Sequence, residues 1–217
     1  MAPFAAVIFD MDGVLVDGEP LHFQAVNTLL ATEGKSISLD EYKPYMGTKS
    51  GWTDMIRDFG LTQPREHYSE IYSAMLVESY RTQSEPLPGA VELVRGLRAA
   101  GMRIGVASSS ILPWVEACLA RLGLADAFDS ITTGSDVENG KPSPEIYLLA
   151  AGRLDANPRA CLAIEDAPAG ILSAKAAGMQ CWAVRTGYTA GLILPGPHRE
   201  FESLLDVSVE DVIGVAV

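Results

Sequence analysis

The 217-residue chain lacks paired cysteines, a long apolar run and an excess of basic residues. Its cysteines are odd in number and lie in apolar surroundings without metal-type spacing, so we expect Cys118, Cys161 and Cys181 to be reduced core residues. No apolar run approaches the ~18 residues that a membrane helix requires, and no basic segment leads into an apolar one near the N-terminus. These absences predict a cytoplasmic protein with no membrane partner.

Basic residues are few: lysine and arginine number 16 against 28 aspartates and glutamates, a formal net charge of −12. This balance disfavours nucleic acid as a partner, because nucleic acid is bound through clusters of basic residues. An anionic substrate would need a local cationic group. The chain also lacks repeats and low-complexity segments, and 48% of its residues are hydrophobic. Its length is sufficient for one α/β core and a smaller appended unit.

Two patterns divide the sequence. Residues 18–83 carry helical hydrophobic spacing and predict an all-helical domain, with helices over 20–34, 38–46, 51–59 and 64–81. After Pro86-Leu87-Pro88-Gly89, helices alternate with short apolar strands, which is typical of a parallel sheet covered by helices on both faces. We therefore expect an α/β core of residues 1–17 and 84–217, with the helical domain inserted after the first strand. Residues 187–197 predict a loop, and residues from 204 onward a last short strand and helix.

Acidic residues follow the first expected strand directly. Ala5 to Phe9 form an apolar run, which is typical of a buried parallel strand, and Asp10 and Asp12 come next. In extended backbone, residues two apart project to the same side, roughly 6.5–7 Å from each other. Two carboxyl groups placed in this way can flank one small tetrahedral centre, one as nucleophile and the other as proton carrier.

Other polar residues are expected at the same edge of the sheet. Ser108 ends the second strand, and Glu165 and Asp166 end a later one, while ligands of open parallel sheets bind beyond the carboxyl ends of the strands. Carboxylates brought together repel one another unless a hard cation shares them, and oxygen-only ligands favour Mg²⁺. We therefore expect a Mg²⁺ ion coordinated by Asp10 and Asp166.

The remaining residues fit phosphoryl transfer. Lys141 can place a positive charge against the nucleophile and the phosphoryl oxygens, and Ser108 can supply a hydroxyl donor. In this scheme Asp10 attacks phosphorus to give an aspartyl-phosphate. Asp12 protonates the leaving alcohol and then activates a water molecule.

These segments, in their order along the chain, resemble the four motifs of the haloacid dehalogenase-like hydrolase superfamily. The helical insert resembles the cap of its β-phosphoglucomutase-like phosphatase branch, and the resemblance runs from residue 4 to about 190. The matching segments are Asp10-Met11-Asp12-Gly13-Val14, Ser108 after an apolar strand, Gly140-Lys141-Pro142, and Ile164-Glu165-Asp166 with Gly170 and Ala177-Gly178-Met179 behind it. Two residues depart from the usual pattern of the family. The pattern often has serine at the position of Ala167, and serine or threonine at the position of Gly18.

The resemblance implies a Rossmann-like core and a helical cap that closes over the substrate. It implies that Asp10 is the nucleophile and that Asp12 is the acid/base, with the Asp12 backbone carbonyl also on the metal. Asp166 would be the other direct protein ligand of Mg²⁺. Glu165 would hold a metal-bound water or bind the ion itself.

Residues on the substrate side are also predicted. Of three consecutive serines, Ser108 is expected to bind phosphate and Ser109 to lend its backbone amide, while one of the three caps the next helix. In the resemblance, His22 falls near the hinge and the substrate, although a hydrogen-bonded structural histidine is an equal alternative. Lys49 resembles a cap residue that contributes a cation to the substrate. Trp52, Tyr68 and Tyr72 are expected in the core of the cap.

The leading hypothesis is a monomeric Mg²⁺-dependent phosphatase for a small phosphorylated metabolite, a sugar phosphate being one candidate. A β-phosphoglucomutase-type phosphomutase is the alternative, since it shares Asp10 and Asp12. The mutases of the family use a cap lysine, and residues 60–84 contain none, which favours hydrolysis. A dehalogenase would not need Asp12, because halide leaves without a proton. A catalytically silent binding protein is a further alternative, disfavoured because all the chemically required side chains are present.

Overall fold

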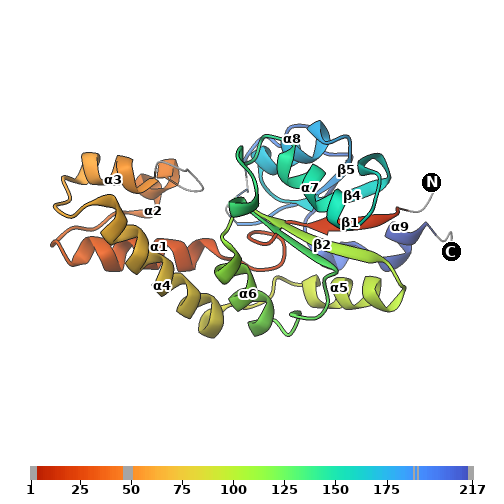
Figure 1. Ribbon diagram of the computed structural model, residues 1–217, viewed down its shortest axis with the longest axis horizontal. Helices are drawn as coiled ribbons and strands as arrows, with labels where there is room; N and C mark the ends of the chain where they lie inside the picture. The colour runs from red at the N-terminus through yellow and green to blue at the C-terminus, as the bar shows by residue number, and fades with distance from the viewer. Residues whose placement is uncertain (1–3, 46–50, 188, 190, 215–217) are drawn as a thin grey trace. The chain divides into compact units, whose positions relative to one another are not determined.

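The computed structural model describes residues 4–45, 51–187, 189 and 191–214. The chain forms two compact units, one of residues 1–17 and 84–217 and the other of residues 18–83. Figure 1 shows the first unit as a sheet between helices and the second as helices alone. No helix in the described ranges combines the length and the apolar character needed to cross a bilayer.

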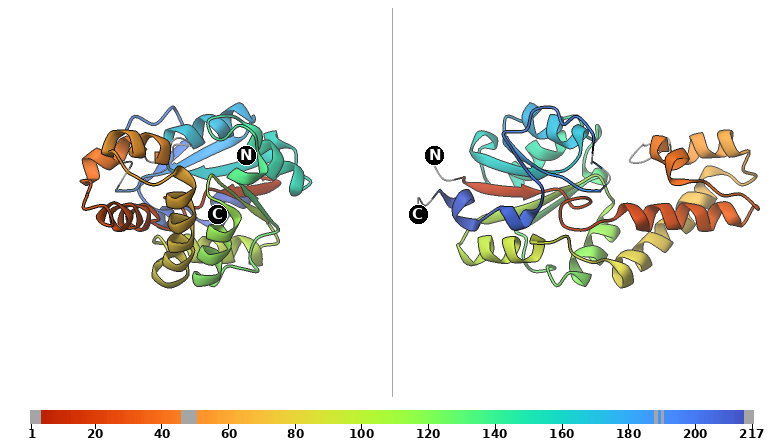
Figure 2. Two further views of the ribbon diagram at one scale, coloured as in Figure 1. Left: turned by 60° about the vertical axis from the view of Figure 1, so that its left-hand side comes forward. Right: turned by 180° about the vertical axis from the view of Figure 1, so that it is seen from behind.

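The larger unit is built on a six-stranded parallel sheet in the order β3-β2-β1-β4-β5-β6. The strands are β1 (Ala6–Phe9), β2 (Arg103–Ser108), β3 (Ser130–Thr133), β4 (Cys161–Glu165), β5 (Gln180–Val184) and β6 (Arg199–Phe201). The helices of this unit are α5 (Ala90–Ala99), α6 (Leu112–Arg121), α7 (Glu145–Arg153), α8 (Pro168–Ala176) and α9 (Val209–Ile213). Figures 1 and 2 show α7 and α8 over one face of the sheet and α5 and α6 over the other, so the predicted α/β architecture is confirmed.

Strand β1 lies at the centre because it is apolar on both of its faces. All four of its residues are fully buried, as expected of a strand covered by helices on both sides. Phe9 is in register with Val106 of β2 and Ile164 of β4. The next residue on each strand therefore lies at the same level of the sheet, which aligns the carboxyl ends of β1, β2 and β4.

The smaller unit consists of α1 (Glu19–Ala31), α2 (Leu39–Tyr42), α3 (Gly51–Phe59), α4 (Arg65–Gln83) and a short 3₁₀ helix (Lys43–Tyr45). Its core is aromatic: the rings of Trp52 and Tyr68 stack with centroids 5.3 Å apart, and Tyr72 meets Trp52 edge-on at 5.5 Å. The expected core role of these three side chains is confirmed.

Two local predictions are wrong. The last strand is Arg199–Phe201, before residue 204, and residues 204–206 form a 3₁₀ helix. This edge strand of Arg-Glu-Phe has neither an apolar run nor polar-apolar alternation of useful length, so its pairing with β5 carries no sequence signal. Helix α6 also begins after Ile111 with no side-chain cap, so none of the three serines before it acts as its cap.

Candidate active site

A buried ion-pair cluster lies at the carboxyl ends of β1 and β4. The Lys141 ammonium donates hydrogen bonds to Asp10 Oδ1 and to Glu165 Oε1, each at 2.7 Å, and to the backbone carbonyl of Ala107 at 2.9 Å. Asp10 directly follows β1, Ala107 belongs to β2 and Glu165 ends β4, so the strand register brings these partners together. The lysine side chain is 7% exposed and that of Glu165 is 1% exposed.

Tyr147 of α7 completes the shell of Glu165. Its hydroxyl donates to Glu165 Oε1 at 2.6 Å, and the Lys141 ammonium lies 5.2 Å from the centre of its ring. The buried Glu165 carboxylate thus has two strong donors, which offset the loss of hydration that burial imposes. Tyr147 was not predicted from the sequence, because its pattern is that of an ordinary apolar position on the buried face of a helix.

Two glycines are required by the acidic residues. Gly13 has φ +81°, and a Cβ there would lie 2.1 Å from Asp166 Oδ2. A Cβ on Gly170, in the first turn of α8, would lie 1.9 Å from Glu165 Oε1. Any side chain at either position would therefore displace a carboxylate of the cluster.

The acidic side chains form a set that suits a hard cation. Single carboxylate oxygens of Asp10, Glu165 and Asp166 all lie within 4.8 Å of one another. Burial raises the pKa of Asp10 to about 7, and burial together with the Glu165 and Asp10 charges raises the pKa of Asp166 well above its ordinary value. One lysine therefore does not fully compensate these carboxylates, and a divalent ion with oxygen ligands fits the residues present.

Asp12 has a different partner from Asp10. The Ser110 hydroxyl donates to Asp12 Oδ2 at 3.0 Å, and the Ser110 backbone N–H donates to Ser108 Oγ at 3.1 Å. Ser108 is buried at the end of β2, whereas Ser109 is exposed. The structure thus brings Asp10, Asp12, Ser108, Lys141, Glu165 and Asp166 to one region of the larger unit. The structure also brings Ser110 to this region. The sequence could not distinguish Ser110 from Ser108 and Ser109, because the three consecutive residues are identical.

The two residues predicted in the helical unit are placed differently. The ring nitrogens of His22 lie 2.6 Å from the Tyr72 hydroxyl and 2.9 Å from the Tyr80 hydroxyl, all within that unit. This arrangement favours the alternative of a structural, hydrogen-bonded histidine. Lys49 lies outside the described residues.

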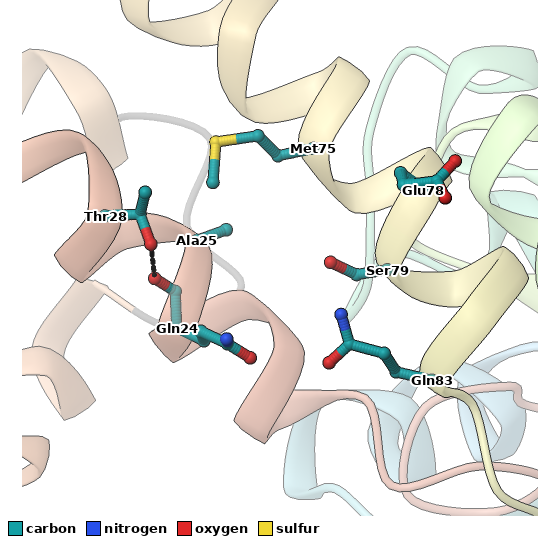
Figure 3. Close-up of a pocket in the computed structure, with 7 residues that line it drawn as sticks. All are labelled: Gln24, Ala25, Thr28, Met75, Glu78, Ser79 and Gln83. Atoms are coloured by element: carbon teal, nitrogen blue, oxygen red, sulfur yellow. Dashed lines mark hydrogen bonds between the residues drawn. The ribbon is translucent and has the colours of Figure 1, made fainter.

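The helical unit also contains an open pocket of about 270 Å³ between α1 and α4. Figure 3 shows its lining, with the Thr28 hydroxyl hydrogen-bonded to the carbonyl of Gln24 at 2.9 Å. The lining residues are Gln24, Ala25, Thr28, Met75, Glu78, Ser79 and Gln83. None of the predicted site residues that the structure describes is among them.

The fold and the site define a class of protein. A parallel α/β sheet carries, at the carboxyl ends of adjacent central strands, a buried lysine among carboxylates that suit a metal ion. A helical unit is inserted directly after the first of these strands. Enzymes use carboxylates and cations placed in this way for nucleophilic and electrostatic catalysis.

Comparison with known proteins identifies the family within this class. The family model of haloacid dehalogenase-like hydrolases matches residues 4–178. The phosphorylated carbohydrates phosphatase of Thermotoga maritima is 35% identical over 182 residues, covering 81% of this chain and 82% of that one. The β-phosphoglucomutase of Bacillus subtilis is 32% identical over 223 residues, covering 91% and 95%. The crystal structure of CbbY from Rhodobacter sphaeroides in complex with phosphate superposes with a TM-score of 0.85 at 29% identity, covering 94% and 96%. The chain belongs to the haloacid dehalogenase-like hydrolases.

Proposed function

We propose that this hydrolase is a Mg²⁺-dependent phosphatase that acts, as a monomer, on a small phosphorylated metabolite through an aspartyl-phosphate on Asp10. One observation carries the proposal: the Asp10 side chain, 11% exposed, is held by the buried Lys141 beside the carboxylates of Glu165 and Asp166. A carboxylate fixed in this way is suited to attack phosphorus, because its orientation is set before the substrate arrives.

The residues of the chain divide the work. Asp10 attacks phosphorus, and the leaving oxygen takes a proton from Asp12; a water molecule then gives its proton to Asp12 and attacks the phosphoryl group, which releases Asp10 and inorganic phosphate. Lys141 holds Asp10 in place and offsets charge on the phosphoryl oxygens. Ser108 and the amide of Ser109 contribute donors to the same oxygens.

The metal site is proposed from the acidic residues. Asp10, Asp166 and the backbone carbonyl of Asp12 would hold Mg²⁺, and Glu165 would orient a water on it or bind it directly. The ion supplies positive charge that reduces the repulsion between an attacking carboxylate and a phosphate dianion.

The substrate class is proposed from the names of two relatives. The relatives include a phosphorylated carbohydrates phosphatase and a β-phosphoglucomutase, so we propose a phosphorylated sugar as substrate. We assign the choice among such sugars to the helical unit of residues 18–83. A malachite-green screen of phosphorylated metabolites identifies the substrate.

The nucleophile assignment is tested with p-nitrophenyl phosphate. Asp10→Asn is expected to abolish Mg²⁺-dependent phosphate release while the circular dichroism spectrum stays that of the wild type. Asp155→Asn is the matched control, because Asp155 lies outside the cluster and its φ of +48° suits asparagine equally well. Turnover by the Asp10 variant at the wild-type rate would refute the proposal.

A phosphomutase is the second candidate, favoured by the likeness to β-phosphoglucomutase. It would share Asp10 and Asp12 but pass the phosphoryl group to a sugar hydroxyl in place of water. β-Glucose 1-phosphate with a catalytic trace of the bisphosphate distinguishes the two by NMR. Hydrolysis yields free sugar and phosphate, whereas a mutase yields the 6-phosphate.

A further inference from the structure

We propose that Ser110 is a positioning residue for Asp12, and that it directs proton transfer to one oxygen of that carboxyl group. The proposal rests on the proposed function, because it needs Asp12 to exchange a proton with the leaving oxygen. The observation behind it is the 3.0 Å hydrogen bond from the Ser110 hydroxyl to Asp12 Oδ2.

Ser110 is itself held firmly. Its N–H donates to Ser108 Oγ at 3.1 Å, and its carbonyl accepts from the N–H of Gly134 at 3.1 Å. A Cβ on Gly134 would lie 2.3 Å from the carbonyl oxygen of Ser109, so only glycine allows this loop to approach. Ser110 is 7% exposed. A buried hydroxyl anchored at both backbone ends can fix the orientation of the carboxyl group that it contacts.

The hydrogen bond assigns different tasks to the two oxygens of Asp12. Oδ2 accepts from Ser110, and we assign to Oδ1 the proton that is exchanged with the leaving oxygen. When the phosphorus–oxygen bond to the alcohol breaks, that oxygen takes the proton from Oδ1, and Asp10 forms the new bond to phosphorus. In the second step, the attacking water returns a proton to Oδ1. Without the Ser110 hydroxyl, the carboxyl group loses one hydrogen bond that orients it toward the leaving oxygen.

A series of substituted phenyl phosphates tests this assignment. Phenyl, 4-chlorophenyl and 4-nitrophenyl phosphate are nearly equal in size but differ in how much the leaving oxygen needs a proton. kcat/KM reports the first transfer, where Asp12 acts as acid. Because general acid catalysis contributes about 10²–10⁴-fold, we expect Ser110→Ala to lower kcat/KM about tenfold for phenyl phosphate and less than about twofold for 4-nitrophenyl phosphate.

Two further variants complete the experiment. Ser110→Thr restores the hydroxyl and is expected to recover the wild-type dependence on the leaving group. Ser208→Ala is the matched control: Ser208 donates to an Asp211 carboxylate oxygen at 2.6 Å as the cap of α9, outside the site. It should leave the dependence unchanged even if it lowers stability.

The outcomes separate the proposal from its alternatives. A steeper dependence on leaving-group pKa in Ser110→Ala, reversed in Ser110→Thr, supports positioning of Asp12. A uniform loss across the series, or no loss, overturns it, since a direct substrate contact or a structural role would not depend on the leaving group. If the wild-type protein shows no Mg²⁺-dependent phosphate release, both the proposed function and this assignment are overturned. If the wild type is active but kcat/KM of Ser110→Ala depends on the leaving-group pKa as in the wild type, only the assignment is overturned.

Discussion

Replacing Gly170 by alanine tests how tightly the acidic cluster is packed. Gly170 lies in the first turn of α8, where alanine alone would stabilise the helix by up to about 1 kcal/mol. Its Cβ, however, would lie 1.9–2.1 Å from the carboxyl atoms of Glu165. The carboxylate must then move away from its two donors, Lys141 at 2.7 Å and Tyr147 at 2.6 Å.

The magnitude follows from those two bonds. A hydrogen bond to a charged group contributes about 1.5–3 kcal/mol, so loss of both costs about 3–6 kcal/mol and exceeds the gain in helix propensity. We expect Gly170→Ala to lower the free energy of unfolding by about 2–5 kcal/mol. The side chain of Glu165 is flexible in principle, but its complete burial leaves no solvated position to which it can move.

Urea unfolding followed by circular dichroism measures this change. Gly152→Ala is the control, because Gly152 is also helical and a Cβ there meets no atom within 4 Å. That variant should be unchanged or more stable by about 0.5–1 kcal/mol. The reasoning would be refuted by a Gly170→Ala protein as stable as the wild type.

Three other perturbations have defined outcomes. Lys141→Met leaves buried carboxylates without their cation, so urea unfolding should show a loss of about 3–5 kcal/mol, together with loss of phosphate release; unchanged stability would contradict the ion-pair description. Asp166→Asn should weaken Mg²⁺ binding at least about tenfold in isothermal titration calorimetry, and an unaltered affinity would exclude Asp166 as a ligand. The hydrogen bond from Arg153 lowers the pKa of Asp136 to about 2, so this carboxylate stabilises the fold above its ordinary pKa and ceases to do so as pH falls through about 2. Asp136→Asn should therefore be less stable than the wild type at pH 7 by about 0.5–1 kcal/mol, and urea unfolding between pH 4 and 2 should show the difference vanish; a difference that grows with acidity would contradict the sign.

Much of the site could be predicted because the ends of the apolar strands can be recognised in the sequence. The apolar run before Asp10 predicts β1, and the similar run before Glu165 predicts β4, and residues at the carboxyl ends of parallel strands meet. The family is confirmed by a match over residues 4–178. The loop residue Lys141 was predicted from its chemistry and from its place among the motifs.

Other parts depend on tertiary packing that leaves no local pattern. Tyr147 reads as an apolar position of α7, and only the position of Glu165 shows what its hydroxyl binds. Ser110 is chemically identical to its two neighbours, and the turn that aims it at Asp12 depends on Gly134, 24 positions later in the sequence. The edge strand β6 is too short and too charged to be recognised before its pairing with β5 is known.

The central claim, that Asp10 is the nucleophile, is tested most directly by trapping the phosphorylated enzyme. The wild-type protein is mixed with Mg²⁺ and a substrate found by the metabolite screen, quenched within milliseconds, and treated with borohydride, which reduces an aspartyl-phosphate to homoserine. Mass spectrometry of the N-terminal peptides should find homoserine at position 10 only when substrate and Mg²⁺ are both present. Rapid phosphate release with an unmodified Asp10, or with the modification at Asp12 or Asp166, would contradict the account.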